Sequence, residues 1–149
     1  MICFKPPQNR RAIICAALIA VFVPTGAHAA SAEPIAGRWL TQDKDAIIAI
    51  GACGSKICGR LAEFLVVPPE GEDQRDVNNP DPAKRQRRLK GMAILTELAA
   101  DKSQWRGRIY DPKSGKTYRS VVKRKNATTL EVKGCVGFLC QTQTWKKAP

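Results

Sequence analysis

Short apolar stretches separated by turn-forming residues recur along the chain, and apolar and polar residues alternate where a β-strand has one buried face. The segment 128–133 shows it most cleanly, with Leu130 and Val132 on one face and Glu131 and Lys133 on the other. No stretch shows the period of an amphipathic helix of ten or more residues. The pattern therefore predicts an all-β protein.

The clearest pair of strands surrounds a tight turn between residues 110 and 118. The runs on either side, 105–110 and 118–122, are rich in the aromatic and β-branched residues that strands favour. Between them stand four turn-forming residues, which are Asp111, Pro112, Ser114 and Gly115. This stretch is predicted to be a β-hairpin.

Further strands are expected over six segments, which are 37–41, 46–53, 57–67, 92–99, 128–133 and 140–145. The segment 92–99, MAILTELA, is ambiguous between helix and strand by propensity, and its short length and its neighbours favour a strand. Residues 68–82 are polar and rich in proline, which predicts a long loop, and residues 83–89 are expected to add at most one helical turn.

About eight short strands with turns between them predict an antiparallel sheet closed into an up-and-down barrel, because closure removes exposed edges. The interior of such a barrel is filled by its own side chains or holds one small ligand. A five-stranded oligonucleotide-binding barrel is the alternative, and it needs fewer strands.

The first 29 residues have the pattern of a secretory signal peptide. A positively charged start precedes an unbroken apolar run, residues 12–23, and Ala27 and Ala29 supply the small residues that a signal peptidase reads. The apolar run is too short to span a bilayer comfortably. We therefore expect a signal helix that is cleaved near Ala29, a single domain over residues 30–149, and a periplasmic or secreted location.

Loss of this leader leaves a strongly basic domain. The chain has 25 Lys and Arg against 13 Asp and Glu, and three of these cations lie in the leader, so the net charge changes from +12 to +9. A field of that sign favours anionic partners. The densest cationic run, residues 84–90, predicts contact with anionic lipid head groups or an acidic polymer, and a merely solvated face is the alternative. No intracellular nucleic acid is expected as a partner of an exported protein.

Four cysteines remain in two pairs of equal spacing, Cys53 with Cys58 and Cys135 with Cys140. Behind an export signal they are expected to form disulfides rather than a zinc site. Glycines within each pair favour a local clamp across a hairpin, while cross-pairing of the two motifs stays open.

Catalytic chemistry is sparse in the same region. The one histidine, His28, lies in the leader, which excludes a Ser-His-Asp triad or a histidine base from residues 30–149. The segment 76–81 offers oxygen ligands, but it lacks the glycine and the distal glutamate of a known calcium loop and is more typical of turns. No catalytic residue, metal or cofactor is therefore expected.

Six short motifs, taken in order, resemble one family of exported bacterial proteins, domain of unknown function 2147. They are GRWLT (37–41), CGSKICGR (53–60), NPDP (79–82), WRGRIYDP (105–112), GKTY (115–118) and TQTW (142–145). The resemblance covers essentially the whole of residues 30–149 and implies a lipocalin-like barrel. The chain departs from the family at Arg87-Arg88, where an Arg-Pro pair is usual, and at Lys147, where the family has arginine.

The resemblance also implies roles for particular residues. In lipocalins a Gly-x-Trp motif packs under a basic residue from the end of the chain, which implies that Gly37, Trp39 and Lys147 close the base of the barrel. Six residues of the motifs and of the adjoining loop are candidates for ligand binding, which are Asn79, Asp81, Arg87, Arg88, Tyr110 and Asp111.

We expect a non-catalytic binding module that carries a small hydrophobic or amphiphilic molecule. The alternative is a basic protein that binds anionic envelope surfaces. An interior filled by its own side chains, including Trp39, Phe64 and Trp105, would argue against carriage.

Overall fold

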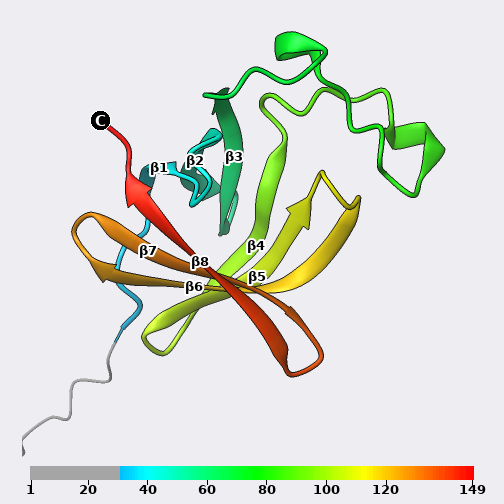
Figure 1. Cartoon of the computed structure of the whole chain (residues 1–149). Helices are drawn as coiled ribbons and strands as arrows, with labels where there is room; N and C mark the ends of the chain where they lie inside the picture. The colour runs from blue at the N-terminus through cyan, green and yellow to red at the C-terminus, as the bar shows by residue number, and fades with distance from the viewer. Residues whose placement is uncertain (1–30) are drawn as a thin grey trace, which may run out of the picture.

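The computed structural model describes residues 31–149, and the predicted signal peptide, residues 1–29, lies outside this part of the chain. Eight antiparallel strands form a closed barrel in sequence order (Figure 1). They are β1 (Gly37–Leu40), β2 (Ala46–Cys53), β3 (Lys56–Phe64), β4 (Ala93–Asp101), β5 (Gln104–Asp111), β6 (Lys116–Asn126), β7 (Thr129–Val136) and β8 (Leu139–Lys147). The all-β class and the eight-stranded barrel are confirmed. No helix within residues 31–149 has the length and apolar character needed to cross a membrane.

The β5–β6 hairpin folds where the turn chemistry predicts it. The Asp111 carboxylate accepts hydrogen bonds from the Lys113 amide at 3.0 Å and from the Ser114 hydroxyl at 2.7 Å. Gly115 has a φ of 68°, and a Cβ at this position would lie 1.9 Å from the carbonyl oxygen of Asn78. The turn therefore needs glycine both for its backbone conformation and for close contact with the long loop.

The structure of β4 explains why the segment 92–99 is ambiguous between helix and strand in the sequence. Leu95 and Leu98 are both fully buried although they are three residues apart, a spacing that places side chains on opposite faces of a regular strand. The register with β5 shifts between Thr96 and Ala99, and Glu97 has a φ of 56°. This bulge turns both leucines inward, so the strand carries a helix-like spacing of apolar residues.

The barrel interior is filled by large side chains. The residues with less than 2% exposure include Trp39, Trp145, Ile35, Leu95, Leu98, Leu130, Val122 and Val132. Phe64 and Trp105 are partly buried and pack against this core. The backbone of β4 packs so closely on Gly107 that a Cβ there would lie 2.4 Å from the carbonyl oxygen of Thr96. Close packing of this kind is typical of a protein interior.

The barrel closes through a short seam between β1 and β8. Only Trp39 and Leu40 pair with β8, opposite Lys147 and Lys146. Strand β8 begins at residue 139, so its first residues run beyond the end of β1. The β7–β8 turn consequently projects from the barrel at the end opposite the C-terminus (Figure 1).

A long connection joins β3 to β4, as the polar segment predicts. It contains two single 3-10 turns, η1 (Gly71–Asp73) and η2 (Pro82–Lys84), and an isolated bridge between Arg75 and Arg88. The helical turn expected over residues 83–89 is limited to η2. Asp81 precedes η2, and its carboxylate accepts a hydrogen bond from the Ala83 amide at 3.1 Å, which caps the turn.

Candidate functional site

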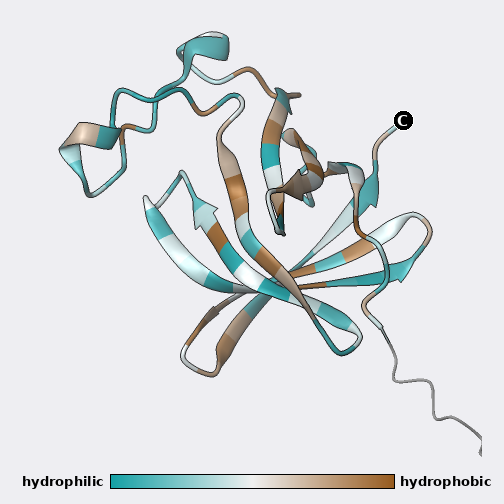
Figure 2. Cartoon of the chain, turned by 180° about the vertical axis from the view of Figure 1, so that it is seen from behind, coloured by the Kyte–Doolittle hydropathy of each residue, from teal (hydrophilic) through white to brown (hydrophobic). Residues whose placement is uncertain are grey.

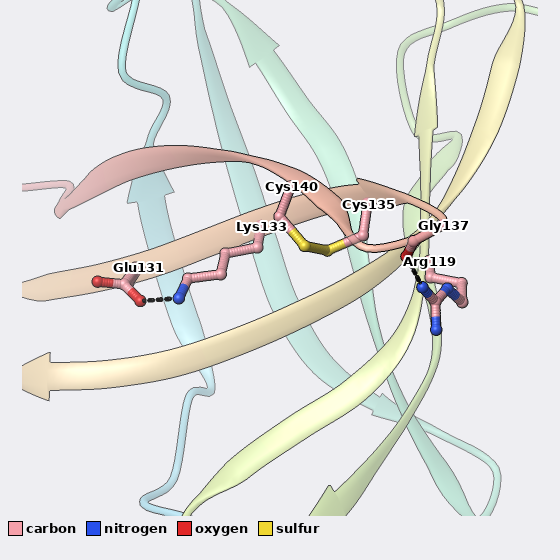
Figure 3. The surroundings of a disulfide bond; sticks show 6 residues. All are labelled: Arg119, Glu131, Lys133, Cys135, Gly137 and Cys140. Atoms are coloured by element: carbon pink, nitrogen blue, oxygen red, sulfur yellow. Dashed lines mark hydrogen bonds and ion pairs between the residues drawn. A yellow bond between two sulfur atoms is a disulfide. The ribbon is translucent and has the colours of Figure 1, made fainter.

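Both disulfides are present, and each is local. Cys53 bonds Cys58 across the β2–β3 turn, and Cys135 bonds Cys140 across the β7–β8 turn (Figure 3). Cys135 and Cys140 stand directly opposite each other in the β7–β8 register. Each bond therefore clamps a hairpin end and not a long stretch of chain.

Gly37, Trp39 and Lys147 come together at the β1–β8 seam. The Lys147 ammonium lies 5.1 Å from the centre of the Trp39 ring. Gly37 has a φ of 133°, and a Cβ there would lie 2.7 Å from the Lys147 nitrogen. The Trp39 indole donates to the carbonyl of Ile35 at 2.9 Å, so its polar edge is satisfied. These contacts support the role in barrel closure, which stays a prediction.

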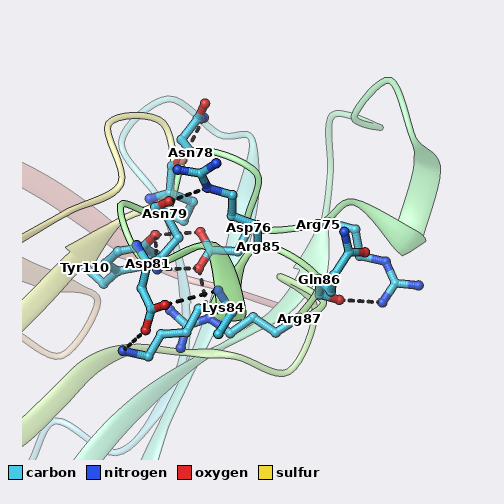
Figure 4. A network of polar contacts seen from close by, with 12 residues as sticks. Arg75, Asp76, Asn78, Asn79, Asp81, Lys84, Arg85, Gln86, Arg87 and Tyr110 are labelled. Carbon is cyan, nitrogen blue, oxygen red and sulfur yellow. Dashed lines mark hydrogen bonds and ion pairs between the residues drawn. The ribbon is translucent and has the colours of Figure 1, made fainter.

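Three of the six candidate binding residues surround a buried carboxylate that the sequence did not single out. The Asp76 side chain is fully buried and accepts hydrogen bonds from the Tyr110 hydroxyl at 2.5 Å, from the Asn79 amide at 2.8 Å and from Arg87 Nε at 2.8 Å (Figure 4). The Arg87 guanidinium also lies 5.5 Å from the centre of the Tyr110 ring. This Asp76 network joins the long loop to the outer face of β5.

Tyr110 is the part of the Asp76 network that belongs to the barrel. Burial, followed by the hydrogen bond to Asp76, raises the pKa of its phenol above the ordinary 10.0. The hydroxyl therefore stays protonated at neutral pH and serves as a donor to Asp76. Because Tyr110, Asn79 and Arg87 satisfy one another through Asp76, their polar groups are already engaged within the protein.

The other three candidates lie apart from the Asp76 network. Asp81 caps η2 and pairs with Lys84 at 3.0 Å, and Arg88 pairs with Asp73 at 2.7 Å. Asp111 holds the β5–β6 turn. The six residues therefore do not form one site, and no local signal in the sequence marks Asp76 as the residue that collects three of them.

The cationic run 84–90 is largely neutralised by acidic residues of the same loop. Besides the pairs of Lys84, Arg87 and Arg88, the Lys90 ammonium lies 2.6 Å from the Glu72 carboxylate. Arg85 donates Nε to the carbonyl of Asn79 at 2.8 Å. Four of the five cations of this run therefore have a carboxylate partner, and Arg85 is held by a backbone carbonyl.

Strand β6 is one of the places in the described chain where cations lack a carboxylate partner. Within residues 31–149, Lys116, Arg119 and Lys123 have no carboxylate within 4.0 Å. Lys116 and Arg119 line a surface hollow of about 540 Å³, together with Arg108 of β5 and the β7 end at Val136. Arg108 lies 3.5 Å from Glu97, and no carboxylate of the described chain lines the hollow itself.

The β7–β8 turn beside this hollow exposes large apolar side chains. Val136 is 65% exposed, Phe138 94% and Leu139 69%. The Arg119 guanidinium donates a hydrogen bond to the carbonyl of Gly137 in this turn (Figure 3). The sequence carried a signal for this feature, since four residues between two cysteines, VGFL, form a hairpin turn without a polar side chain.

A closed eight-stranded antiparallel barrel, with a Gly-x-Trp motif packed under a lysine from the last strand, defines the lipocalin-like class. Within that class, the chain belongs to the family described as "Uncharacterized protein conserved in bacteria (DUF2147)", whose model matches residues 37–147. The predicted family is thus confirmed.

One solved structure supports the same fold. The chain is similar to protein HP1028 from the human pathogen Helicobacter pylori, which is described as belonging to the lipocalin family. The TM-score is 0.67 at 24% sequence identity, over 78% of this chain and 84% of that chain. At this identity the likeness shows the fold alone. No curated protein matches the chain.

Proposed function

We propose that the chain is an exported, non-catalytic binding module that acts at an anionic surface of the bacterial envelope. The observation that carries this proposal is the unpaired positive charge of β6, where Lys116, Arg119 and Lys123 face solvent without a carboxylate partner in the described chain. The two disulfides suit an oxidising compartment outside the cytosol. The attraction is electrostatic, so it does not require an enclosed site.

The distribution of charge favours a binding surface for anionic groups that lies outside the cationic run 84–90. Carboxylates of the long loop neutralise most of that run. Strand β6 keeps cations without a carboxylate partner, and the hollow beside it has no acidic lining residue within residues 31–149. We therefore assign contact with anionic groups to the surface formed by these cations and the hollow.

The test is sedimentation of the exported protein with vesicles. Vesicles of equal parts phosphatidylglycerol and phosphatidylcholine are expected to bind it, and pure phosphatidylcholine vesicles much less. Binding is expected to weaken as the salt concentration rises from about 0.05 to about 0.5 M, because exposed charges are screened. Equal binding to both vesicles, or binding that does not respond to salt, would remove the proposal.

Carriage of a small apolar or amphiphilic molecule is the second candidate, and one observation favours it. The Ser120 hydroxyl is buried and has no hydrogen-bond partner within residues 31–149. It lies between Gly107 and Gly134 on the neighbouring strands. A buried polar group of this kind normally has a partner, which a bound molecule would supply. Native mass spectrometry of the exported protein tests this candidate, and a spectrum without any retained molecule would eliminate it.

A further inference from the structure

We propose that the apolar tip, residues 136–139 of the β7–β8 hairpin, enters the lipid bilayer, and that the cations of the neighbouring hollow hold the anionic head groups. This inference rests on the proposed function and names its partner as a phospholipid membrane.

The exposure of the apolar tip is the first observation. Single exposed apolar side chains are common on soluble proteins. Here Val136, Phe138 and Leu139 are all mostly exposed within four consecutive residues, and Phe138 makes almost no contact with the rest of the protein. A contiguous exposed apolar group marks a surface that is covered by a partner.

The apolar tip also stands clear of the barrel. The β1–β8 pairing ends at Leu40 opposite Lys146, so the β8 residues that follow the tip extend beyond β1. Figure 2 shows the β7–β8 hairpin as a hydrophobic projection, whereas the β4–β5 turn at the opposite end of the barrel is hydrophilic.

The backbone of the apolar tip is prepared for a medium poor in water. Val136 pairs with Leu139, the disulfide Cys135–Cys140 closes the turn, and the Gly137 carbonyl accepts a hydrogen bond from Arg119. Unsatisfied backbone groups are costly in lipid, so these bonds lower the cost of insertion. The clamp also limits the conformational freedom that binding would remove.

The positive charge beside the apolar tip indicates which kind of partner surface the tip would bind. Arg108, Lys116 and Arg119 line the hollow that reaches Val136 and Gly137. Apolar side chains next to cations match the interface of a bilayer that contains anionic lipids, where each nearby cation contributes about 1 kcal/mol. A soluble acidic polymer offers the charge but no apolar phase, so it would leave Phe138 unused.

The central experiment compares Phe138→Ser with Val67→Ser in vesicle binding. Val67 is 74% exposed on the long loop, so its replacement also changes an exposed apolar side chain to serine, but away from the hairpin. With vesicles of equal parts phosphatidylglycerol and phosphatidylcholine, Phe138→Ser is expected to weaken binding by about ten- to a hundredfold. Val67→Ser is expected to bind like the wild type. Both side chains are exposed, so the thermal midpoints of both variants should match the wild type.

A second pair of variants tests the charge. Lys116→Gln is expected to weaken binding to the same vesicles by about fivefold. Lys56, at the β2–β3 turn, is also exposed and without a carboxylate partner in the described chain, so Lys56→Gln is the matched control. Equal losses from the two changes would contradict a localised contact.

Insertion is measured directly with Phe138→Trp. Its added fluorescence is expected to shift to the blue with anionic vesicles and to be quenched by brominated lipid, while that of Val67→Trp is not. If Phe138→Ser binds as tightly as Val67→Ser, or if Phe138→Trp is not quenched, the tip does not insert. Salt-sensitive binding of the wild type would then leave the proposed function standing. Failure of the wild type to bind anionic vesicles would overturn both.

Discussion

Removal of the Tyr110 hydroxyl tests whether the Asp76 network fastens the long loop to the barrel. The Tyr110 side chain comes from β5, whereas Asp76, Asn79 and Arg87 come from the loop. Tyr110→Phe keeps the ring and its contact with the Arg87 guanidinium, and removes one donor from a fully buried carboxylate.

The structure sets the size of the effect. The lost hydrogen bond joins the Tyr110 hydroxyl to the charged Asp76 carboxylate at 2.5 Å, and bonds of this kind contribute about 1.5–3 kcal/mol. The Asn79 amide also loses an acceptor at 3.0 Å but keeps its bond to Asp76 at 2.8 Å. We therefore expect the free energy of unfolding to fall by about 2 kcal/mol.

Two measurements distinguish a loss of stability of the whole domain from a loss of stability of the long loop alone. If the loop unfolds together with the barrel, urea denaturation of the disulfide-intact protein reports the whole decrease. If the loop opens alone, hydrogen exchange reports it at the Asp76 amide, which donates to the Arg87 carbonyl at 3.0 Å. A decrease of about 2 kcal/mol corresponds to roughly thirtyfold faster exchange from the open state.

Tyr118→Phe is the matched control. Within residues 31–149, the Tyr118 hydroxyl has one hydrogen-bond partner, the exposed Ser114 hydroxyl at 3.3 Å. Its removal is therefore expected to change the free energy of unfolding by less than about 0.5 kcal/mol. If Tyr110→Phe changes neither the urea midpoint nor the exchange of the Asp76 amide by more than this control, the Asp76 network does not fasten the loop.

Tyr110, Lys147 and the Cys53–Cys58 disulfide each give a further expected outcome. Burial and Asp76 raise the pKa of Tyr110 above 10.0, so the unfolded chain loses the phenol proton at lower pH than the folded protein does. The contribution of Tyr110 to stability is therefore complete below pH 10 and falls at higher pH. The difference in the free energy of unfolding between wild type and Tyr110→Phe should shrink from pH 9 to pH 11. Lys147→Gln is expected to lower the free energy of unfolding by about 0.5–1 kcal/mol, and Lys147→Arg is expected to retain the wild-type value. Equal losses for Lys147→Gln and Lys146→Gln in urea denaturation would argue against closure through Trp39. Alkylation of the unreduced exported protein should label no cysteine, and replacing Cys53 and Cys58 together by serine should cost about 2 kcal/mol in urea denaturation.

The sequence locates most strands because their signals are local. The β5–β6 hairpin depends on Asp111 and Gly115, which act within a few residues of the turn. Strand β4 was harder, since the bulge at Glu97 gives Leu95 and Leu98 a spacing that a regular strand does not allow. Periodicity assumes regular geometry, so a bulge that breaks it is not visible in the pattern alone.

The site depends on contacts that are distant in sequence, and these were harder to predict. Tyr110 faces outward on β5, and its burial requires a loop residue 34 positions away to fold back onto it. The same folding brings acidic residues of the loop onto the run 84–90. The net charge of the sequence counts these groups but does not place them, so the pairing of four cations in this run could not be predicted from the sequence.

The filled interior favours a barrel that acts as a rigid support for its outer surface. Trp39, Trp145 and Leu95 occupy the centre, and replacing a buried side chain of this size by alanine costs about 2–5 kcal/mol, so opening a cavity there would threaten the fold. The apolar tip has no such constraint, because its side chains are exposed and the disulfide Cys135–Cys140 holds its backbone. Substitutions at the tip are therefore expected to leave the stability of the barrel unchanged. A chain with polar residues at positions 136, 138 and 139 should unfold at the same temperature as the wild type and fail to insert into anionic vesicles.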